Sequence, residues 1–315
     1  LAAHGVRLAA AGSVRVTAIR RSTWGTVRLF DVIRLGFATL ASAKVEEQAA
    51  YYTGVLGLKL VAADPALTVF ANQAGQHVVV LERGDAAGIR GLAFEIAPDS
   101  DLGALAVQLR ASGVSCDIQS DPVAGVATCL AVADPDGTLI QLVPKFDSFD
   151  VGPLTRGIAP AKLGHVARFT SQLRAQLAFY KDVLGFRISD WRADESAYFM
   201  RCGPDHHTVN FFAAPSSKLH HIAFELRDWS EIGRACNILA ENRLRLDWGP
   251  SRHVIGHNIA CYHSTSEGVR IELYTEMDQM TNERLGYFDP RPWHEDRPQF
   301  PRGWGPEFGK SAWGP

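Results

Sequence analysis

An internal repeat constrains the fold of this 315-residue chain more than any other sequence feature. The segment 35–38, Leu-Gly-Phe-Ala, recurs at 163–166 as Leu-Gly-His-Val, and Gly57 recurs as Gly185 after the helical apolar spacing that follows each segment. The offset is 128 residues at both ends, which indicates a repeat and not a chance match. A glycine at that point is typical of a helix C-terminus. We therefore expect one strand-and-helix unit used twice.

A second pair of segments, 91–96 and 221–226, shares the letters Ala-Phe-Glu at the same position. Each segment precedes a predicted helix and then strands in which apolar and polar residues alternate, as they do in 269–273. Together the repeats predict four βαβββ modules, at roughly 35–85, 89–145, 163–213 and 219–277.

Pairs of these modules predict an α+β fold of two domains, 35–145 and 163–277, which suits a chain of this length. Residues 1–34 precede them as an N-terminal extension, whose first 30 residues carry five arginines and no acid. That composition resembles a transit peptide, but we favour an extension without packed structure. The C-terminal tail, 278–315, contains the proline-rich run 289–294, which excludes regular helix or sheet there. We expect the tail to lie over the second domain.

Composition excludes several classes of function. The formal net charge of −2 gives no reason to expect nucleic acid or an anionic membrane surface as a partner. No apolar run approaches the roughly 20 residues that a membrane span requires. The five cysteines are odd in number and scattered, without a Cys-x-x-Cys pair, so neither a disulfide framework nor a zinc knot is indicated. We expect a cytoplasmic protein.

The two halves differ where chemically active side chains occur. Eight of the eleven histidines lie between His165 and His263. Packing residues repeat between the halves, whereas the imidazoles and one carboxylate do not, so a site is predicted in the second domain only. The positions compared are His165 with Phe37, His221 with Gly91, Tyr262 with Ala131, and Glu272 with Gln141.

Two neutral imidazoles and one carboxylate form the facial set that suits non-haem Fe(II). His165, His221 and Glu272 provide this set, and each lies on a predicted strand, whose rigidity suits a site of fixed geometry. Each residue also has an ordinary interpretation: His165 as a core histidine with satisfied hydrogen bonds, and Glu272 as a solvent-facing acid.

His220 is the alternative ligand to His221. Neighbouring strand residues point to opposite faces, so we expect only one of the two to belong to the site. The apolar residues at 222, 224 and 226 share the face of His220, whereas small and polar residues share the face of His221. We therefore choose His221.

With these residues in view, the chain resembles the type I extradiol ring-cleavage dioxygenases of the vicinal oxygen chelate superfamily. That family has Gly-x-His, a spacer, an apolar-Tyr pair, a turn and a Glu; here the pattern runs from Ser251-Arg252-His253 through Cys261-Tyr262 to Glu272. Ser251, Cys261 and Ser266 depart from the family's usual residues, but at turn or packing positions. The segment 205–211, Asp-His-His-Thr-Val-Asn-Phe, also resembles a histidine segment of the family.

The resemblance implies the vicinal oxygen chelate fold and an enzyme that opens a catechol-type ring beside its diol with O2. It implies Fe(II), or Mn(II), bound by the three residues chosen above. It further implies that His207 acts as acid and base, with His206 as a weaker alternative, and that Tyr262 and His253 bind and help to turn over the substrate. A structural role is the alternative for His253 and Tyr262. We also expect a homo-oligomer.

Other functions remain open to the same fold. One alternative is another metal-dependent enzyme: a hydroquinone dioxygenase, an isomerase or a lyase. A metal-free ligand-binding protein is the second, since one fold hosts many functions. Trp191, Phe199, Trp248 and the tail are candidates for lining a pocket, and we expect His257 and His263 on a solvated loop.

Overall fold

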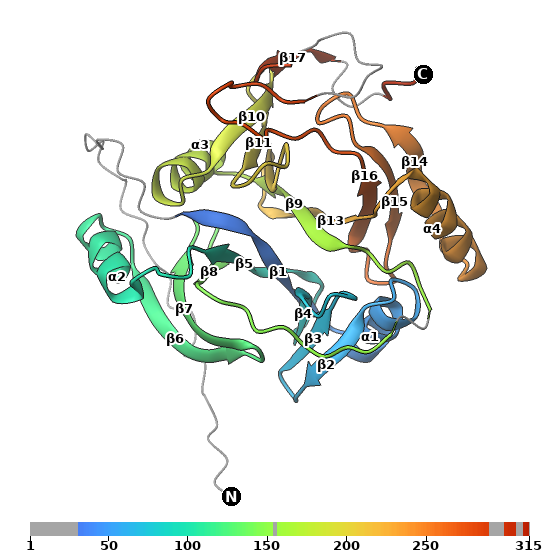
Figure 1. The fold of residues 1–315 in the computed structure, drawn as a ribbon, viewed down its shortest axis with the longest axis horizontal. Helices are drawn as coiled ribbons and strands as arrows, with labels where there is room; N and C mark the ends of the chain where they lie inside the picture. The colour runs from blue at the N-terminus through green and yellow to red at the C-terminus, as the bar shows by residue number, and fades with distance from the viewer. Residues whose placement is uncertain (1–30, 154–155, 290–298, 307–310, 315) are drawn as a thin grey trace, which may run out of the picture.

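The computed structural model describes residues 31–153, 156–289, 299–306 and 311–314. The N-terminal extension up to residue 30, and residues 290–298 of the tail, lie outside the described residues. The described chain forms two curved sheets, one from each half, with the helices on their outer sides (Figure 1). Among the described residues, none of the helices is long and apolar enough to cross a bilayer.

The first half contains two βαβββ modules in sequence. Its elements are β1 (Val32–Ser42), α1 (Val45–Gly54), β2 (Lys59–Ala63), β3 (Leu67–Ala71), β4 (His77–Arg83), β5 (Gly88–Ile96), α2 (Leu102–Ala111), β6 (Cys116–Val123), β7 (Val126–Ala133) and β8 (Leu139–Val143). The order within its sheet is β2-β3-β4-β1-β5-β8-β7-β6. The first strand therefore begins at Val32, a little before the expected start of the module.

The second half repeats this arrangement. Its elements are β9 (Lys162–Thr170), α3 (Leu173–Ala178), the π-helical turn η1 (Phe179–Val183), β10 (Arg187–Arg192), β11 (Ala197–Arg201), β12 (Val209–Ala213), β13 (Lys218–Glu225), α4 (Trp229–Glu241), β14 (Leu246–Arg252), β15 (Ile259–Ser264), β16 (Arg270–Thr275) and β17 (Gly303–Trp304). The sheet order is β14-β15-β16-β13-β9-β12-β11-β10-β17. The predicted α+β fold with two modules in each sheet is confirmed.

The glycines that define the repeat serve the same local purpose in both halves. Gly57 and Gly185 follow the first helix of their modules with φ values of +74° and +75°. That left-handed conformation favours glycine, which has no Cβ to clash. Both positions thus direct the chain from a helix into the next strand.

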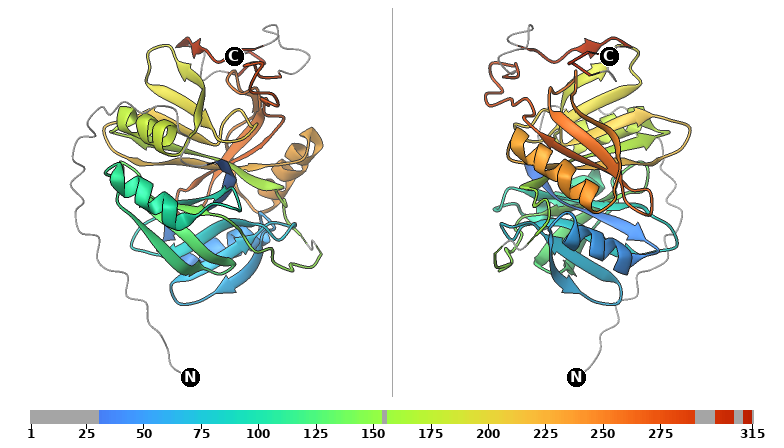
Figure 2. Two further views of the ribbon diagram at one scale, coloured as in Figure 1. Left: turned by 60° about the vertical axis from the view of Figure 1, so that its left-hand side comes forward. Right: turned by 90° about the vertical axis from the view of Figure 1, so that its right-hand side faces the viewer.

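The two halves share one hydrophobic core, which holds them together. Phe94 of the first half packs edge-on against Phe186, with ring centroids 5.4 Å apart. Arg168 of β9 is buried and bonds to Asp134 and, at 2.5 Å, to the Thr138 hydroxyl. The α1 and α4 helices lie on the same flank of the molecule (Figure 2). The second sheet is therefore supported along its first strand by the first half.

Strand register shows which residues of the two halves are equivalent. Phe37 pairs with Ala93, and Ala93 pairs with Gln141. In the second half His165 pairs with Ala223, and Ala223 pairs with Glu272. The positions compared from the sequence thus occupy the same places in their sheets.

Aromatic side chains fill the inner face of the first sheet. Phe37 is fully buried, and its ring lies 5.6 Å from that of His77 and 5.9 Å from that of Phe146. Phe149 covers His77 at 4.8 Å. The corresponding region of the second sheet is lined by polar side chains instead.

The described part of the C-terminal tail lies on the second half, as expected. Strand β17 pairs with β10 at the edge of the second sheet (Figure 1). Further along, Ser311 forms a backbone bridge with His253, and its hydroxyl bonds to that of Ser251.

Candidate metal centre

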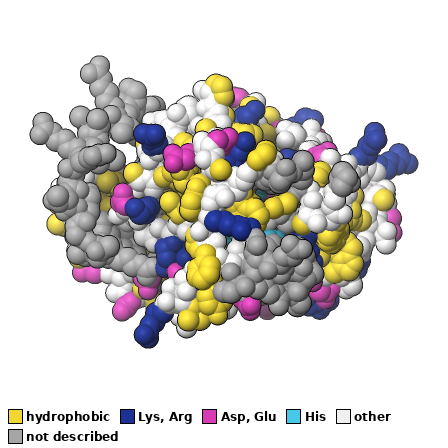
Figure 3. Space-filling model, turned by 90° about the horizontal axis from the view of Figure 1, so that it is seen from above, with side chains coloured by type: hydrophobic (Ala, Val, Ile, Leu, Met, Phe, Trp, Pro, Cys, Tyr) yellow, Lys and Arg dark blue, Asp and Glu magenta, His cyan; other side chains and the backbone are white. Residues whose placement is uncertain are grey.

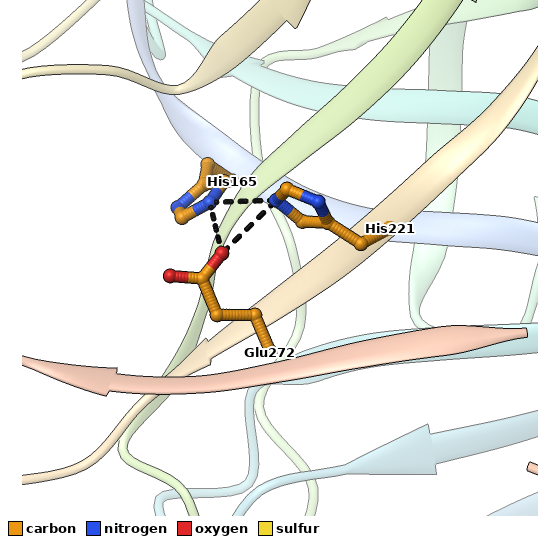
Figure 4. Close-up of side chains that lie close together, drawn as sticks. All are labelled: His165, His221 and Glu272. Atoms are coloured by element: carbon orange, nitrogen blue, oxygen red, sulfur yellow. Dashed lines mark hydrogen bonds and ion pairs between the residues drawn. The ribbon is translucent and has the colours of Figure 1, made fainter. Parts of the chain in front are cut away.

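Three strands side by side bring His165, His221 and Glu272 together. They lie on β9, β13 and β16, which are neighbours in the second sheet. His165 Nε2 lies 3.2 Å from His221 Nε2 and 3.1 Å from Glu272 Oε2, and the third side of the triangle, His221 to Glu272, is 3.0 Å. All three side chains are buried and point toward one another (Figure 4).

The triangle has the dimensions of a metal site. Metal–ligand distances of about 2.1 Å place neighbouring ligands of an octahedral site about 3.0 Å apart. The observed separations of 3.0–3.2 Å match one triangular face of such a site. Two imidazoles and a carboxylate are also the donor set of the non-haem Fe(II) facial triad. The three residues therefore fit a divalent transition-metal ion.

Electrostatics keep the donors in forms that can bind a metal. Burial lowers the pKa of His221 to about 4, against the opposing effect of Glu272. Burial alone would raise the pKa of Glu272, but the charge of His165 and the hydrogen bonds from His165 and His221 hold it well below its ordinary value. At neutral pH the site thus offers a neutral imidazole at His221 and an ionised carboxylate.

The expectation that His220 and His221 point to opposite faces is wrong, although only His221 belongs to the triangle of donors. A β-bulge between Leu219 and His221 breaks the alternation of β13, and both histidines line the same cavity. His220 Nδ1 lies 2.6 Å from His221 Nδ1. His221 presents Nε2 to the triangle, whereas His220 contacts the other edge of the same ring.

His207 forms part of the cavity wall beside the triangle. Its ring centroid is 4.3 Å from that of His165, and burial lowers its pKa well below the ordinary value, so it is neutral. His206 points away and is fully buried against Phe288. The two neighbours thus lie on opposite sides of the wall, with His207 toward the cavity.

Tyr262 and His253 complete a hydrogen-bonded chain to the carboxylate. Tyr262 Oη donates to Glu272 Oε2 at 2.7 Å and lies 3.0 Å from His253 Nε2. Burial and the charge of Glu272 raise the pKa of Tyr262, so it stays a neutral donor. The Trp248 ring stacks on that of His253, with centroids 4.8 Å apart and planes 3° from parallel.

Asn258 is a member of the site that the sequence analysis missed. Its Nδ2 donates to Glu272 Oε1 at 2.8 Å, so both carboxylate oxygens have a donor. Tyr262 pairs with Glu272, and residues two and four positions before Tyr262 point to the same face of an extended strand. This alternation would have placed Asn258 on the face of Glu272. Arg270, two residues before Glu272, lies over the Tyr262 ring at 4.2 Å.

A cavity of about 220 Å³ opens over the triangle. An engineered cavity of about 150 Å³ holds benzene, so this one can admit a substituted aromatic ring. Phe199 and Trp248 line it as expected, whereas Trp191 and the described tail residues do not. Seen from above, histidine side chains appear deep between apolar and basic side chains (Figure 3). The other lining residues are Asn210, Phe212, Ile255 and Arg270.

The expectation of a solvated loop for His257 and His263 is wrong. Both are fully buried. His257 bonds to Asp278, and His263 Nε2 lies 2.6 Å from the Tyr51 hydroxyl of the first half. These contacts join segments far apart in the chain, which explains why local pattern did not reveal them.

Sequence relatives carry names of ring-cleaving dioxygenases. Metapyrocatechase 2 of Cupriavidus necator is 30% identical over 201 residues, which are 57% of this chain and 62% of that protein. Biphenyl-2,3-diol 1,2-dioxygenase of Paraburkholderia xenovorans is 26% identical over 257 residues, covering 76% of this chain and 86% of that protein. An iron-dependent extradiol dioxygenase of Rhodococcus jostii is 30% identical over 135 residues, covering 38% of this chain and 45% of that protein.

Solved structures share the fold over most of the chain. Homoprotocatechuate 2,3-dioxygenase of Brevibacterium fuscum, in a complex with 3,4-dihydroxyphenylacetate, has a TM-score of 0.75 at 22% identity, covering 91% of this chain and 90% of that one. A Mn(II)-bound glyoxalase of Novosphingobium aromaticivorans has a TM-score of 0.76 at 25% identity, covering 90% and 91%. The model of one family matches residues 34–142 and 162–273, which include all six site residues expected from the sequence. The chain belongs to the Glyoxalase/Bleomycin resistance protein/Dioxygenase superfamily.

Proposed function

We propose that the protein is an extradiol dioxygenase that cleaves a catechol-type ring next to its vicinal diol with O2. In this proposal His165, His221 and Glu272 hold Fe(II), with Mn(II) as the alternative metal. The triangle of donor atoms, 3.0–3.2 Å apart under an aromatic-sized cavity, is the observation that carries the proposal. The names of the sequence relatives support the reaction.

Fe(II), when bound, would supply the redox chemistry that lets O2 react with an aromatic diol. The chain's own residues would then position the ring and move protons. Tyr262 would hydrogen-bond a substrate oxygen with the hydroxyl that now donates to Glu272. His253, whose ring is stacked on that of Trp248, would bind the substrate beside Tyr262. Phe199 and Trp248 would exclude water from the ring.

His207 would act as the acid and base of the reaction. Its imidazole is neutral and lies against His165 without belonging to the triangle of donors. A neutral imidazole both accepts and donates protons near neutral pH, which the opening of a diol ring requires.

An isomerase of the same fold is the second candidate, because a Mn(II)-bound glyoxalase matches the structure as well as a dioxygenase does. The set of His207, His253 and Tyr262 around the cavity favours the dioxygenase, since an isomerase has no need of O2 or its protonation. A hydroquinone dioxygenase or a lyase would use the same donors. A metal-free binding protein would have no use for three buried donors in a triangle.

A homo-oligomer in the cytoplasm completes the proposal. Light scattering after gel filtration measures the oligomeric state directly, and a mass equal to one chain would refute this part alone.

The main test is anaerobic reconstitution with Fe(II), followed by a panel of catechols. The proposal predicts O2 uptake that matches catechol consumption and a yellow ring-fission product. Turnover without O2 uptake would support an isomerase or lyase, and a protein that binds no Fe(II) would refute the metal site. His165→Ala is the matched control, because it removes one of the three donors.

A further inference from the structure

A buried chain of three side chains runs behind the cavity wall, from Asp190 through His206 to His207. Asp190 Oδ2 lies 3.0 Å from His206 Nε2, and His206 Nδ1 lies 3.0 Å from His207 Nδ1. Asp190 and His206 have no exposed surface, and His207 is 4% exposed. These three hydrogen-bonded side chains therefore connect the protein interior to the cavity and are shielded from solvent along their length.

The first link sets the position of one proton. Asp190 accepts at 2.8 Å from the Trp304 indole Nε1 and at 2.8 Å from the backbone N–H of Arg302, so its oxygens act as acceptors. A carboxylate that accepts from these donors requires a donor at His206 as well. His206 Nε2 therefore carries a hydrogen.

The second link follows from the first. Two imidazole nitrogens 3.0 Å apart share one hydrogen, since one must donate and the other accept. His206 donates from Nε2 to Asp190, so its other nitrogen, Nδ1, is the acceptor in this second link. His207 must then carry its hydrogen on Nδ1, and a neutral His207 leaves Nε2 bare on the edge of the ring that remains for the cavity.

The first half lacks this arrangement at equivalent positions. His77 lies two residues before Val79, as His207 lies two residues before Val209. Val79 pairs with β1 and Val209 pairs with β9 at equivalent positions. Asp190 pairs with Phe199 across a bulge, as Ala62 pairs with Val69. The residue before His77 is an exposed glutamine, Gln76. His207 thus has a counterpart in the first half, His77. Asp190 and His206 have none, and they occur only in the half with the proposed metal donors.

We propose that Asp190 and His206 are positioning residues that fix the tautomer and the ring orientation of His207, so that a bare Nε2 faces the substrate as a proton acceptor. The inference rests on the proposed function for its meaning in turnover. It also assigns a role to the tail, because Arg302 and Trp304 hold the Asp190 carboxylate in place. An aspartate that holds a catalytic histidine in one tautomer is an established arrangement in other enzymes.

Proton–nitrogen correlation NMR on the full chain with isotope-labelled histidine tests the tautomer directly. The metal-free wild type suffices, with the His207 signal assigned by its loss in His207→Phe. We expect a hydrogen on Nδ1 and a bare Nε2. A hydrogen on Nε2 in the wild type would overturn the inference, whatever the enzyme's activity.

The His206→Phe variant tests the consequence for turnover. Without the acceptor at His206, the tautomer of His207 is no longer fixed, so we expect its two nitrogens to give averaged signals. In the Fe(II)-loaded enzyme kcat should fall by about 10- to 100-fold, part of what a positioned proton-transfer group contributes. Bound iron and KM should stay near wild type.

His77→Phe, the change at the first half's counterpart of His207, is the matched control and should alter neither the His207 signals nor kcat. Wild-type kcat in His206→Phe, or a His207 signal unchanged from wild type, would refute the positioning role. If no variant and no wild type turns over any catechol, the proposed function fails while the wild-type NMR result still stands as a separate test.

Discussion

Replacing His221 with alanine distinguishes a metal site from an ordinary cluster of buried histidines. The variant loses the nitrogen that lies 3.2 Å from His165 Nε2 and 3.0 Å from Glu272 Oε2, so two of three donors remain. Removing a group that merely orients a ligand costs about 10- to 100-fold in metal affinity. Loss of the ligand itself should exceed about 100-fold, or about 2.7 kcal/mol of binding free energy.

The expected effect can be measured as a shift in melting temperature. Fe(II) at about 100 times the wild-type Kd stabilises the folded protein by about 2.7 kcal/mol. At about 2–4 °C per kcal/mol this raises the wild-type melting temperature by about 5–10 °C under anaerobic conditions. In H221A the same concentration fills at most about half of the sites, so the rise should not exceed about 1 °C or 2 °C.

Two neighbouring variants make the result specific. His220→Ala removes the nitrogen 2.6 Å behind His221, so it should weaken metal binding by about 10- to 100-fold and no more. Gln141→Ala changes the first-half counterpart of Glu272 and should leave the metal-dependent shift intact. Full iron occupancy in H221A, with loss of iron in His220→Ala, would refute the assignment and identify His220 as the ligand.

Four further changes test other parts of the structure. His207→Phe should keep bound Fe(II) while turnover falls by about 10²–10⁴, in steady-state assays; loss of iron would instead make it a ligand. Tyr262→Phe removes the hydroxyl 2.7 Å from Glu272 Oε2 and should raise the metal Kd about 10- to 100-fold by titration. Phe37→Ala should lower the free energy of unfolding by about 3–5 kcal/mol in denaturant, with metal content unchanged if the first half is catalytically silent. Burial lowers the pKa of His77, so below about pH 6.5 the unfolded chain binds a proton that the folded chain resists, and stability falls. His77→Phe should therefore show a shallower loss of stability between about pH 6.5 and 5; an unchanged slope would contradict this.

The repeat made the fold and the buried cluster of His165, His221 and Glu272 predictable because equivalent positions occupy equivalent places in the two sheets. Phe37 and Gln141 pair through Ala93 as His165 and Glu272 pair through Ala223. A polar residue that replaces an apolar one at such a position must face the same interior. Comparison within one chain therefore located a buried site.

Other members of the site could not be predicted in this way. The bulge before His221 brings His220 into the cavity, and bulges leave no simple mark on residue alternation. The contact of His206 with Asp190 joins residues 16 positions apart, and Trp304 reaches the same carboxylate from the tail. Such contacts depend on tertiary packing, which the local periodicity of the sequence does not predict.

The difference between the halves follows from how each fills the inner face of the same sheet. In the first half the rings of Phe37, His77 and Phe146 pack against one another and occupy this face of the sheet. The second half keeps a cavity of about 220 Å³ over buried polar donors, which gives up packing energy at its centre. The shared core, with Phe94 against Phe186 and Arg168 bonded across the boundary, supplies stabilisation from outside that cavity. We therefore expect the first half to serve as a scaffold for the open, polar site of the second half.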